Sequence, residues 1–332
     1  MSNFRQKLLI LGIILTLSVI SLGAYVRLSD AGLGCPDWPG CYGKLLGVPD
    51  NHAEISHAES VFPNAPVEID KAWKEMVHRY LASILGFVII LLAASAIWSR
   101  QSPPKITPYI FLVGLVGVQG ALGMLTVTWL LKPVIVTLHL LGGMLILATL
   151  VSMHARENPS WVKNNAFHTQ SAAWLVTAVI LFQIALGGWT STNYAAMACT
   201  DYPLCQGQWI PDDLDWSHAF VFNRELGQTS DGQMLSLQTL TAIHWTHRSF
   251  ALVVLIACVT LALHLRKKAD TANMGNWLFA AIVFQVLIGI SNVWLQWPLS
   301  LAVLHNTGAA ILLAISVFIS VQTGKTEVAV GH

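Results

Sequence analysis

Eight apolar runs, each close to the length of a membrane-crossing helix, constrain this 332-residue chain more than any other feature. A helix needs about 20 residues to cross a hydrocarbon core of roughly 30 Å. Only 11% of the residues are charged, whereas a soluble domain carries about 25%. We therefore predict an all-α, polytopic membrane protein with eight transmembrane helices. The runs fall near residues 8–26, 75–98, 107–129, 133–153, 171–192, 238–264, 276–296 and 299–321.

Lys and Arg residues gather at alternate ends of the runs, and this distribution predicts the orientation of the chain. Loops rich in Lys and Arg stay on the cytoplasmic side, so we expect both termini in the cytoplasm. The loops at residues 27–74 and 193–237 are long and acidic, and we expect them in the periplasm of a bacterial cell inner membrane. The first run is longer than the apolar stretch of a cleavable signal, so we expect a retained helix. The basic residues on the expected cytoplasmic side are Arg5, Lys7, Arg100, Lys105, Arg156, Lys163, Arg266, Lys267, Lys268 and Lys325.

The sequence contains an internal repeat. Cys35 and Cys41 form a Cys-x5-Cys motif that recurs as Cys199 and Cys205, with Asp, an aromatic residue and Pro at matching internal positions. The motifs are 164 positions apart, and other matches are offset by 164 to 169 positions. A steady offset indicates two halves with the same topology, related by an axis along the membrane normal. We predict two pseudo-symmetric four-helix bundles, residues 1–165 and 166–332. The other matches pair Gly23 with Gly187, Gln119 with Gln285, Gly123 with Gly289, His78 with His247, and His139 with His305.

Each Cys-x5-Cys pair is a candidate disulfide, Cys35–Cys41 and Cys199–Cys205, because the periplasm is oxidising. Four cysteines that bind zinc are the alternative, although this spacing is longer than usual and no His stands at ligand spacing. Neither loop contains Cys-x-x-Cys-His, the motif that attaches a c-type haem. The fifth cysteine, Cys258, falls inside the sixth apolar run and is expected to be a small buried residue.

Four histidines fall near the expected outer ends of the even-numbered helices: His78, His139, His247 and His305. Ionisable residues within membrane helices usually face the interior of a bundle and carry function. A hydrogen-bonded core or interfacial histidine is the alternative for any one of them. Four histidines at positions related by the repeat argue against that alternative and favour two paired sites.

A histidine from each of two neighbouring helices can bind a haem iron from both sides, with neutral imidazole as the axial ligand. Gly142 and Gly308 each follow a candidate ligand by three residues, so we expect them to let a flat macrocycle approach the backbone. Zinc or copper bound by the same imidazoles is the alternative, but no Cys, Met or carboxylate completes a compact ligand set in each half.

Haem also carries two propionates, which require cations near the polar surface. Arg79 and Arg248 directly follow two of the candidate ligands, and Arg27 and Lys132 fall at the outer ends of the first and third helices. A guanidinium suits a carboxylate because it can donate two parallel hydrogen bonds. The alternative for each cation is that it anchors a helix end in the headgroup region.

The two halves differ at one position that bears on chemistry. Glu75 in the first half aligns with His244 in the second, and each precedes a candidate iron ligand by three residues. Residues three apart share a helical face, so Glu75 should point into the same cavity as His78. A carboxylate there is costly unless it pairs or reacts. The first half therefore resembles a reaction site and the second a plain bis-histidine redox centre.

Six motifs from the first helix to the last can be compared with those of known families. They are the run from Arg27 to Pro39, Glu75-x-x-His78-Arg79, Thr137-Leu138-His139, Gly187-Gly188-Trp189-Thr190, His244-x-x-His247-Arg248 and Leu304-His305-Asn306. These motifs resemble those of the haem A synthase family. The resemblance implies eight transmembrane helices in two pseudo-symmetric halves. It also implies an oxidoreductase that converts the methyl group at C8 of haem O into a formyl group, giving haem A for cytochrome oxidase biogenesis.

The same resemblance implies roles for individual residues. It places a prosthetic haem b on His247 and His305, beside Arg248, and it places the substrate haem on His78 and His139. Glu75 matches the essential carboxylate of the family, with a role open between proton handling and stabilisation of a cation at the methyl carbon. The family also implies that the formyl oxygen comes from water and that electrons leave through haem b. The cysteine pairs match those of some members, with a role open between structural disulfide and redox relay.

Two other functions use the same features. A di-haem cytochrome b that only carries electrons would need the same four histidines but leaves Glu75 unexplained. A transporter that rocks around a midplane site fits poorly, because the ionisable residues cluster near one face. As partners we expect haem O, the haem O synthase that delivers it, and membrane lipid, but no nucleic acid; self-association and the identity of the electron acceptor are left open.

Overall fold

The computed structural model describes residues 3–99, 103–157 and 167–324, and in these ranges the chain is built of helices joined by irregular loops. Eight of the helices are long and apolar enough to cross a membrane, which confirms the predicted fold class of an all-α, multi-pass membrane protein. The eight helices are α1 (Asn3–Leu28), α3 (Ile69–Trp98), α4 (Pro103–Thr128), α5 (Pro133–Glu157), α6 (Phe167–Thr192), α8 (Leu237–Arg266), α9 (Ala272–Trp294) and α10 (Leu299–Gln322). Three short helices lie in the long loops: α2 (His52–Val61), η1 (Ala195–Met197) and α7 (Trp216–Ala219).

Helix α3 begins before the apolar run that predicted it. The run begins near residue 75, whereas the helix begins at Ile69 and has a polar first turn in which Lys74 pairs with Asp70 at 2.5 Å. Hydropathy predicts only the part of a helix that needs an apolar environment. A helix can extend beyond that part into water where ion pairs such as Lys74 with Asp70 stabilise its polar turns. The functional end of α3 therefore projects beyond the apolar run, towards the first long loop.

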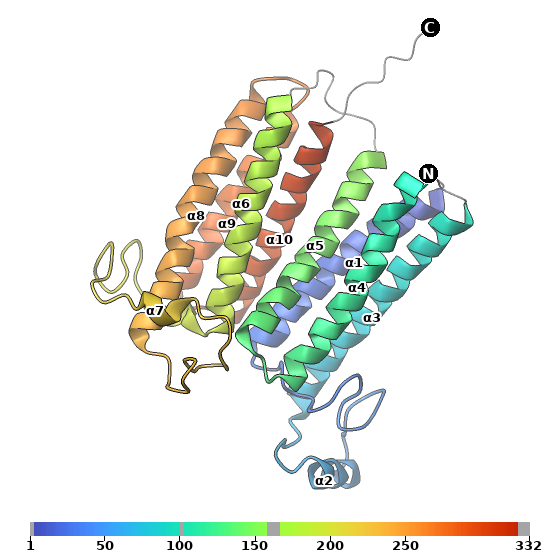
Figure 1. Ribbon diagram of the computed structural model, residues 1–332, viewed down its shortest axis with the longest axis vertical. Coiled ribbons are helices and arrows are strands. Elements are labelled where there is room, and N and C mark those ends of the chain that lie inside the picture. Colours follow the sequence, from blue (N-terminus) through green and yellow to red (C-terminus); the bar gives the residue numbers. More distant parts are fainter. Residues whose placement is uncertain (1–2, 100–102, 158–166, 325–332) are drawn as a thin grey trace.

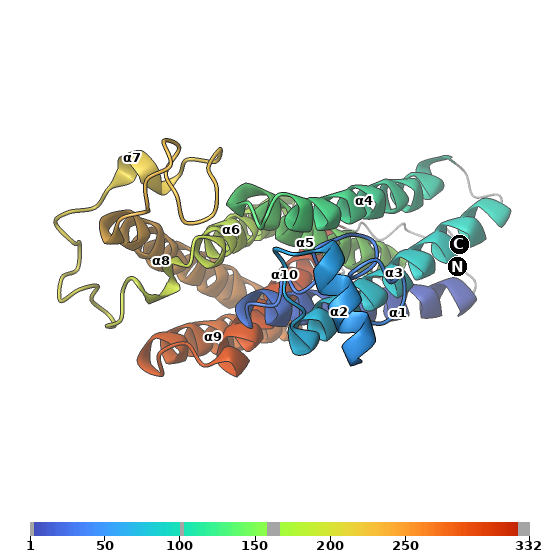
Figure 2. The same cartoon turned by 90° about the horizontal axis from the view of Figure 1, so that it is seen from below.

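The eight long helices pack as two groups of four (Figures 1 and 2). In the first group, α1 and α4 each pack against both α3 and α5, so α3 and α5 occupy opposite corners. In the second group, α6 and α9 each pack against both α8 and α10, so α8 and α10 occupy opposite corners. All four candidate iron ligands thus lie on corner helices that face one another across a group.

The two groups meet through α1 with α10, α5 with α10, and α5 with α6. This set is unchanged when each helix is exchanged for its counterpart in the repeat, α1 for α6 and α5 for α10. A two-fold axis between the groups would require such a set. The pseudo-symmetry of the two halves nevertheless stays a prediction.

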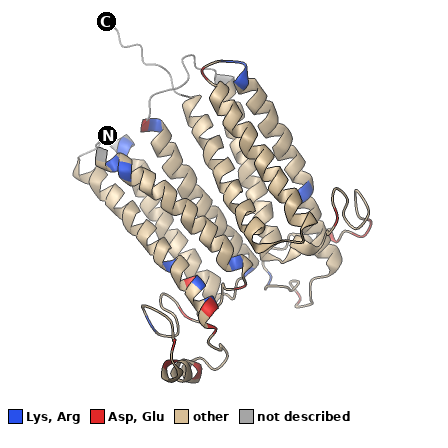
Figure 3. Cartoon of the chain, turned by 180° about the vertical axis from the view of Figure 1, so that it is seen from behind, with Lys and Arg blue, Asp and Glu red and all other residues tan. Residues whose placement is uncertain are grey.

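The apolar core fills the half of the bundle that lies away from the long loops. Its largest cluster includes Leu147 of α5, Leu261 of α8 and Leu313 of α10, all buried. The start of α1 and the end of α10 lie at this end of the bundle (Figure 1). Figure 3 shows most Asp and Glu residues in or beside the loops at the other end, and the four candidate iron ligands lie in the helix halves nearest to this end. Which end faces the cytoplasm stays a prediction.

Candidate functional site

Two of the candidate iron ligands rest against a glycine of the preceding long helix. A Cβ atom on Gly23 of α1 would lie 2.9 Å from Cε1 of His78 on α3, and a Cβ atom on Gly187 of α6 would lie 3.0 Å from Cε1 of His247 on α8. A methyl group at either glycine would therefore require the imidazole ring or the helix to shift. The helix in front of each histidine is therefore shaped around the imidazole ring.

The other two histidines have the same arrangement. A Cβ atom on Gly123 of α4 would lie 3.3 Å from Cε1 of His139 on α5, and one on Gly289 of α9 would lie 3.1 Å from Cε1 of His305 on α10. All four residues are half-buried, and Nδ1 of His78 and of His139 is buried. All four histidines therefore pack in the same way, with the ring against a glycine of the preceding long helix, as expected of residues in equivalent sites.

The two predicted histidine pairs each span one group of four helices. His78 and His139 lie on α3 and α5, and His247 and His305 lie on α8 and α10, which occupy opposite corners of their groups. Each ring rests against a glycine of another helix in the same group, so it is directed between the helices. The structure therefore places the members of each predicted pair across one group from each other, and their role as iron ligands stays a prediction.

Gln183 distinguishes the histidine on α8 from its counterpart on α3. The side-chain Nε2 of Gln183 lies 3.1 Å from Nδ1 of His247 and donates to its main-chain oxygen at 2.9 Å. The corresponding residue of α1, 164 positions earlier, is Val19, and among the described residues Nδ1 of His78 is buried without a hydrogen-bond partner. In the described structure, the ring of His247 therefore has a side-chain hydrogen-bond partner that the ring of His78 lacks.

Gly142 and Gly308 do not leave room for a macrocycle, so the prediction for these two glycines is wrong. A Cβ atom on Gly142 would collide with Oε1 of Gln119, and one on Gly308 would collide with Oε1 of Gln285. Both glutamines donate from Nε2 to the main-chain oxygen of the neighbouring histidine, at 2.6 Å on α5 and 2.9 Å on α10. Each glycine therefore admits a glutamine that holds the histidine helix.

Glu75 is buried at the point where α3 meets the first long loop. Its Oε2 accepts a hydrogen bond from the main-chain N–H of Cys35 at 3.0 Å, and its Oε1 pairs with Nη2 of Arg79 at 2.5 Å. Cys35 is joined to Cys41 by a disulfide, as predicted. The carboxylate is therefore paired with a cation and fixed to the disulfide loop, which reduces the cost of its burial.

His244 occupies the corresponding place in the second half. Its Nδ1 accepts a hydrogen bond from the main-chain N–H of Cys199 at 3.2 Å, and Cys199 is joined to Cys205 by the second predicted disulfide. The repeat thus keeps one contact, from a loop N–H to a buried side chain, while the side chain changes from the carboxylate of Glu75 to an imidazole. The two halves differ chemically at this point, as the sequence predicted.

A family-model comparison and curated relatives agree on what the chain resembles. The model of the COX15-CtaA family, described as cytochrome oxidase assembly protein, matches residues 6–317. The chain belongs to this family. A heme A synthase of Shewanella oneidensis is 41% identical over 309 residues, which cover 92% of each chain. The heme A synthase of Caulobacter vibrioides is 27% identical over 90% of each chain, and that of Halalkalibacterium halodurans is 27% identical over 82% of this chain and 88% of its own.

The two arginines that follow the α3 and α8 histidines bind the disulfide loops. Arg79 donates from Nη1 to the carbonyl oxygens of Asp37, at 3.0 Å, and of Gly40. Arg248 donates from Nη2 to the carbonyl oxygen of Leu204 at 2.9 Å, while its Nη1 is buried without a hydrogen-bond partner among the described residues. Arg79 is thus hydrogen-bonded to its loop, whereas Nη1 of Arg248 is available to donate to another group.

The remaining predicted cations link different parts of the chain. Arg27 donates from Nη2 to the main-chain oxygen of Ser191 at 3.0 Å and stacks 4.2 Å from the ring centre of Tyr194. Ser191 is the residue that the repeat aligns with Arg27, so this bond joins two equivalent positions. Lys132 pairs with Glu225 of the second long loop at 3.2 Å. These contacts place both cations at the loop end of the bundle.

The zinc alternative is not supported, because the two disulfides use four of the five cysteines. In the ranges that the structure describes, no three His, Cys, Asp or Glu side chains lie close enough to hold a metal ion together. Paired histidines remain the available ligands, and these suit the two axial positions of a haem iron.

The sequence prediction missed the residues that hold the histidines. Gly123 and Gly289 recur at one offset together with Gln119 and Gln285, so the repeat contained the signal for these four. Their function was not assigned because a match between helices does not show which side chains meet. Gln183 has no counterpart in the first half, so the repeat gave no signal for it.

Proposed function

We propose that this protein is a membrane-bound haem A synthase, an oxidoreductase that converts the C8 methyl group of haem O into a formyl group for cytochrome oxidase. The conversion removes four electrons and four protons and takes one oxygen atom from water. The observation that carries the proposal is a buried carboxylate, Glu75, one helical turn from a paired histidine in only one half of the chain. The similarity to heme A synthases along nearly the whole chain supports it.

The second half, residues 166–332, is proposed to hold a resident haem b between His247 and His305. The side chains fit such a group: they come from opposite corners of four helices, and a glycine lies beside each ring. Haem b would supply one-electron transfer. The protein residues hold the two rings in place, with Gln183 bound to the His247 ring and main chain and Gln285 to those of His305.

The first half, residues 1–165, is proposed to bind the substrate haem between His78 and His139. Support for two related halves comes from the helix contacts, which are unchanged by exchange of the halves. Further support comes from the bond between Arg27 and Ser191, which are 164 positions apart. Residues that a two-fold axis superimposes lie close together only near that axis, so this contact is expected at the seam between the halves.

Glu75 is proposed to act on the reacting methyl group, either by accepting its protons or by stabilising positive charge that develops on the carbon. Both roles require a carboxylate whose position is fixed before the reaction. The N–H of Cys35 and the guanidinium of Arg79 bind one oxygen each and supply this restraint. The disulfide loop would also cover the site and restrict the access of water.

Unpartnered buried donors indicate where haem propionates would bind. Nη1 of Arg248 and Nε of Arg27 are both buried without a hydrogen bond, and a propionate could satisfy them with charge-assisted bonds. The contacts of Arg79 and Lys132 lead instead to the loops, which supports a structural role for these two cations. We further propose a bacterial inner membrane with the long loops outside, and haem O synthase as the donor of the substrate.

The composition of the bound haem tests the proposal. The purified full chain is extracted with acidified acetone, and each haem is identified by chromatography and mass. Haem b together with haem O, or with an alcohol or aldehyde derivative of it, is expected. Two equivalents of haem b per chain and no other haem would contradict the proposal and favour a di-haem electron carrier.

A further inference from the structure

Both disulfide loops expose two consecutive apolar side chains at equivalent positions. Leu45 and Leu46 follow the first disulfide turn and are 73% and 77% exposed, and Trp209 and Ile210 follow the second and are 72% and 64% exposed. Each residue of the second pair lies 164 positions after its counterpart, the same offset as the cysteines. Apolar pairs this exposed at both tips indicate a surface that something covers.

The backbone presents the two pairs in the same way. In the first loop, Cys41 and Lys44 exchange two main-chain hydrogen bonds, of 2.8 and 3.0 Å, and in the second loop Cys205 and Gln208 exchange bonds of 2.8 and 3.1 Å. Each apolar pair comes directly after this closed turn. We call the two pairs the loop tips; the turns fix the direction in which both tips project.

A hydrogen bond ties each tip to the side of a long helix. The main-chain N–H of Gly47, beside the first tip, donates to the hydroxyl of Tyr80 on α3 at 2.8 Å. The indole Nε1 of Trp245 on α8 donates to the main-chain oxygen of Trp209 in the second tip at 2.9 Å. In Figures 1 and 2 the loop between α6 and α8 extends to the side of α8. The tips therefore lie beside the bundle.

The helix surface below each tip is the apolar surface that faces lipid. Ile84 and Phe87 follow Tyr80 by four and seven residues, and Leu252 follows Trp245 by seven, so they lie on the same helix faces. These side chains are exposed in the described chain, as lipid-facing residues of a membrane span are. The loop tips thus continue the lipid-facing surface of α3 and α8 towards the loop end.

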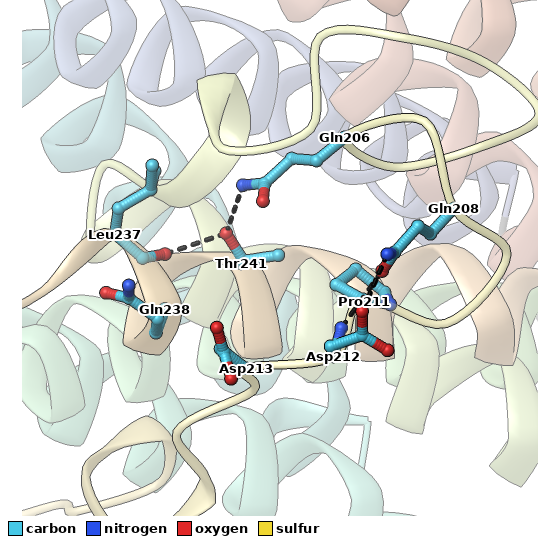
Figure 4. Close-up of a pocket in the computed structure, with 8 residues that line it drawn as sticks. All are labelled: Gln206, Gln208, Pro211, Asp212, Asp213, Leu237, Gln238 and Thr241. Atoms are coloured by element: carbon cyan, nitrogen blue, oxygen red, sulfur yellow. Dashed lines mark hydrogen bonds between the residues drawn. The ribbon is translucent and has the colours of Figure 1, made fainter.

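The second loop turns its polar side chains towards α8. Figure 4 shows a pocket between the loop and the start of α8, where Nε2 of Gln206 donates to Oγ1 of Thr241 at 2.9 Å. Gln208 also lines this pocket and donates to Asp212 at 2.7 Å. Polar residues on the inner side and an apolar tip on the outer side make the loop amphipathic.

We propose that the two loop tips insert into the membrane leaflet at the loop end of the bundle, at the boundary between headgroups and acyl chains. Trp and aliphatic side chains favour this boundary, and the polar inner faces of the loops remain on the protein. Insertion would hold each disulfide loop over its helix group. It would thereby restrain the loop N–H groups that bind Glu75 and His244.

Site-directed spin labelling of the haem-loaded full chain in lipid nanodiscs tests this proposal. Nitroxides are placed at Leu46→Cys and Ile210→Cys, and the remaining free cysteine, Cys258, is buried and does not compete for label. Matched controls in the same loops are Ser60→Cys and Gln233→Cys, both at exposed positions. Collisions with oxygen, which concentrates in lipid, are compared with collisions with a water-soluble nickel chelate.

Labels at both tips are expected to collide several-fold more with oxygen and several-fold less with nickel than the control labels do. Nickel collisions equal to those of the controls would place the tips in water and overturn the proposal. Low collision rates with both reagents would place the tips under a protein partner or a second copy, which also overturns it. If a cysteine variant mispairs, quenching of Trp209 by brominated lipid, measured as wild type minus Trp209→Phe, decides the question.

Discussion

The main-chain N–H of Cys35 donates to Oε2 of Glu75 across 3.0 Å, which joins the first disulfide loop to the buried carboxylate. The other carboxylate oxygen pairs with Arg79, and Arg79 in turn donates to carbonyl oxygens of the same loop. The loop, the cation and the carboxylate therefore form one connected unit. A change in any member should alter the position of the carboxylate, although only Glu75 is proposed to act on the substrate.

Replacement of Glu75 should separate catalysis from haem b binding. Glu75→Ala and Glu75→Gln should lower haem A formation by about 10²- to 10⁴-fold, the usual contribution of a positioned acid or base. Haem b should remain, because its proposed ligands lie in the other half. Both quantities are measured by acid-acetone extraction of cells and of purified protein. His244→Gln, at the equivalent position, is the matched control and should keep much more activity; normal haem A levels in Glu75→Gln would refute the assignment.

The two disulfides should differ in their effect on activity. Each closes a loop with a sequence separation of six residues, so loss of either should cost a similar amount of stability, about 2 kcal/mol by chain entropy. Only the first loop holds Glu75, the carboxylate that is proposed to act on the substrate. The double variant Cys35→Ser/Cys41→Ser should therefore lose more haem A formation than Cys199→Ser/Cys205→Ser at equal loss of thermal stability. Equal losses of haem A formation would contradict this coupling.

Gln183 should slow the loss of the proposed haem b from the second half of the chain. It binds both the ring and the main chain of His247, whereas Val19 stands at its place in the first half. Removal of a group that orients a metal ligand typically weakens metal binding 10- to 100-fold. Gln183→Val should therefore speed transfer of haem b to an acceptor protein by about that factor and change its electron paramagnetic resonance spectrum. The conservative variant Gln183→Asn separates packing from hydrogen bonding, and an unchanged transfer rate in Gln183→Val would refute the positioning role.

Hydropathy was sufficient to predict the eight helices, and the repeat predicts the pairing of His78 with His139 and of His247 with His305, which stays a prediction. Both predictions depend on periodic features of the sequence, which can be identified without knowledge of side-chain packing. The partner of Arg79 could not be predicted in this way. Its carbonyl acceptors belong to an irregular loop, whose path depends on a disulfide and on turns that hydropathy does not describe.

Gly142 also shows that side-chain packing could not be predicted from the sequence. Gly142 was predicted to leave space for a macrocycle because it shares a helical face with His139. The space over this glycine is occupied by the side chain of Gln119. Sequence spacing gives the face of a helix on which a residue lies, but it does not identify which neighbouring side chain reaches that face.

The glycines in contact with the histidine rings should tolerate no added methyl group. A Cβ atom on Gly187 would lie 3.0 Å from the ring of His247, and one on Gly23 would lie 2.9 Å from that of His78. Overpacking of this kind costs about 1–3 kcal/mol, and it can be relieved by displacement of the ring. Gly187→Ala should therefore lower haem b per chain, and Gly23→Ala should lower the substrate haem while haem b remains.

Gly117→Ala provides the matched control for these two variants, because a Cβ atom there would meet nothing within 4 Å. Haem content is measured per chain by the pyridine haemochrome spectrum and by extraction, and helix content by circular dichroism. The control should retain both haems at wild-type levels. If Gly187→Ala and Gly23→Ala lost the same haem, the assignment of the two histidine pairs to different haems would be wrong. A selective loss in each variant requires two separate sites, because each methyl group meets the ring of only one histidine pair.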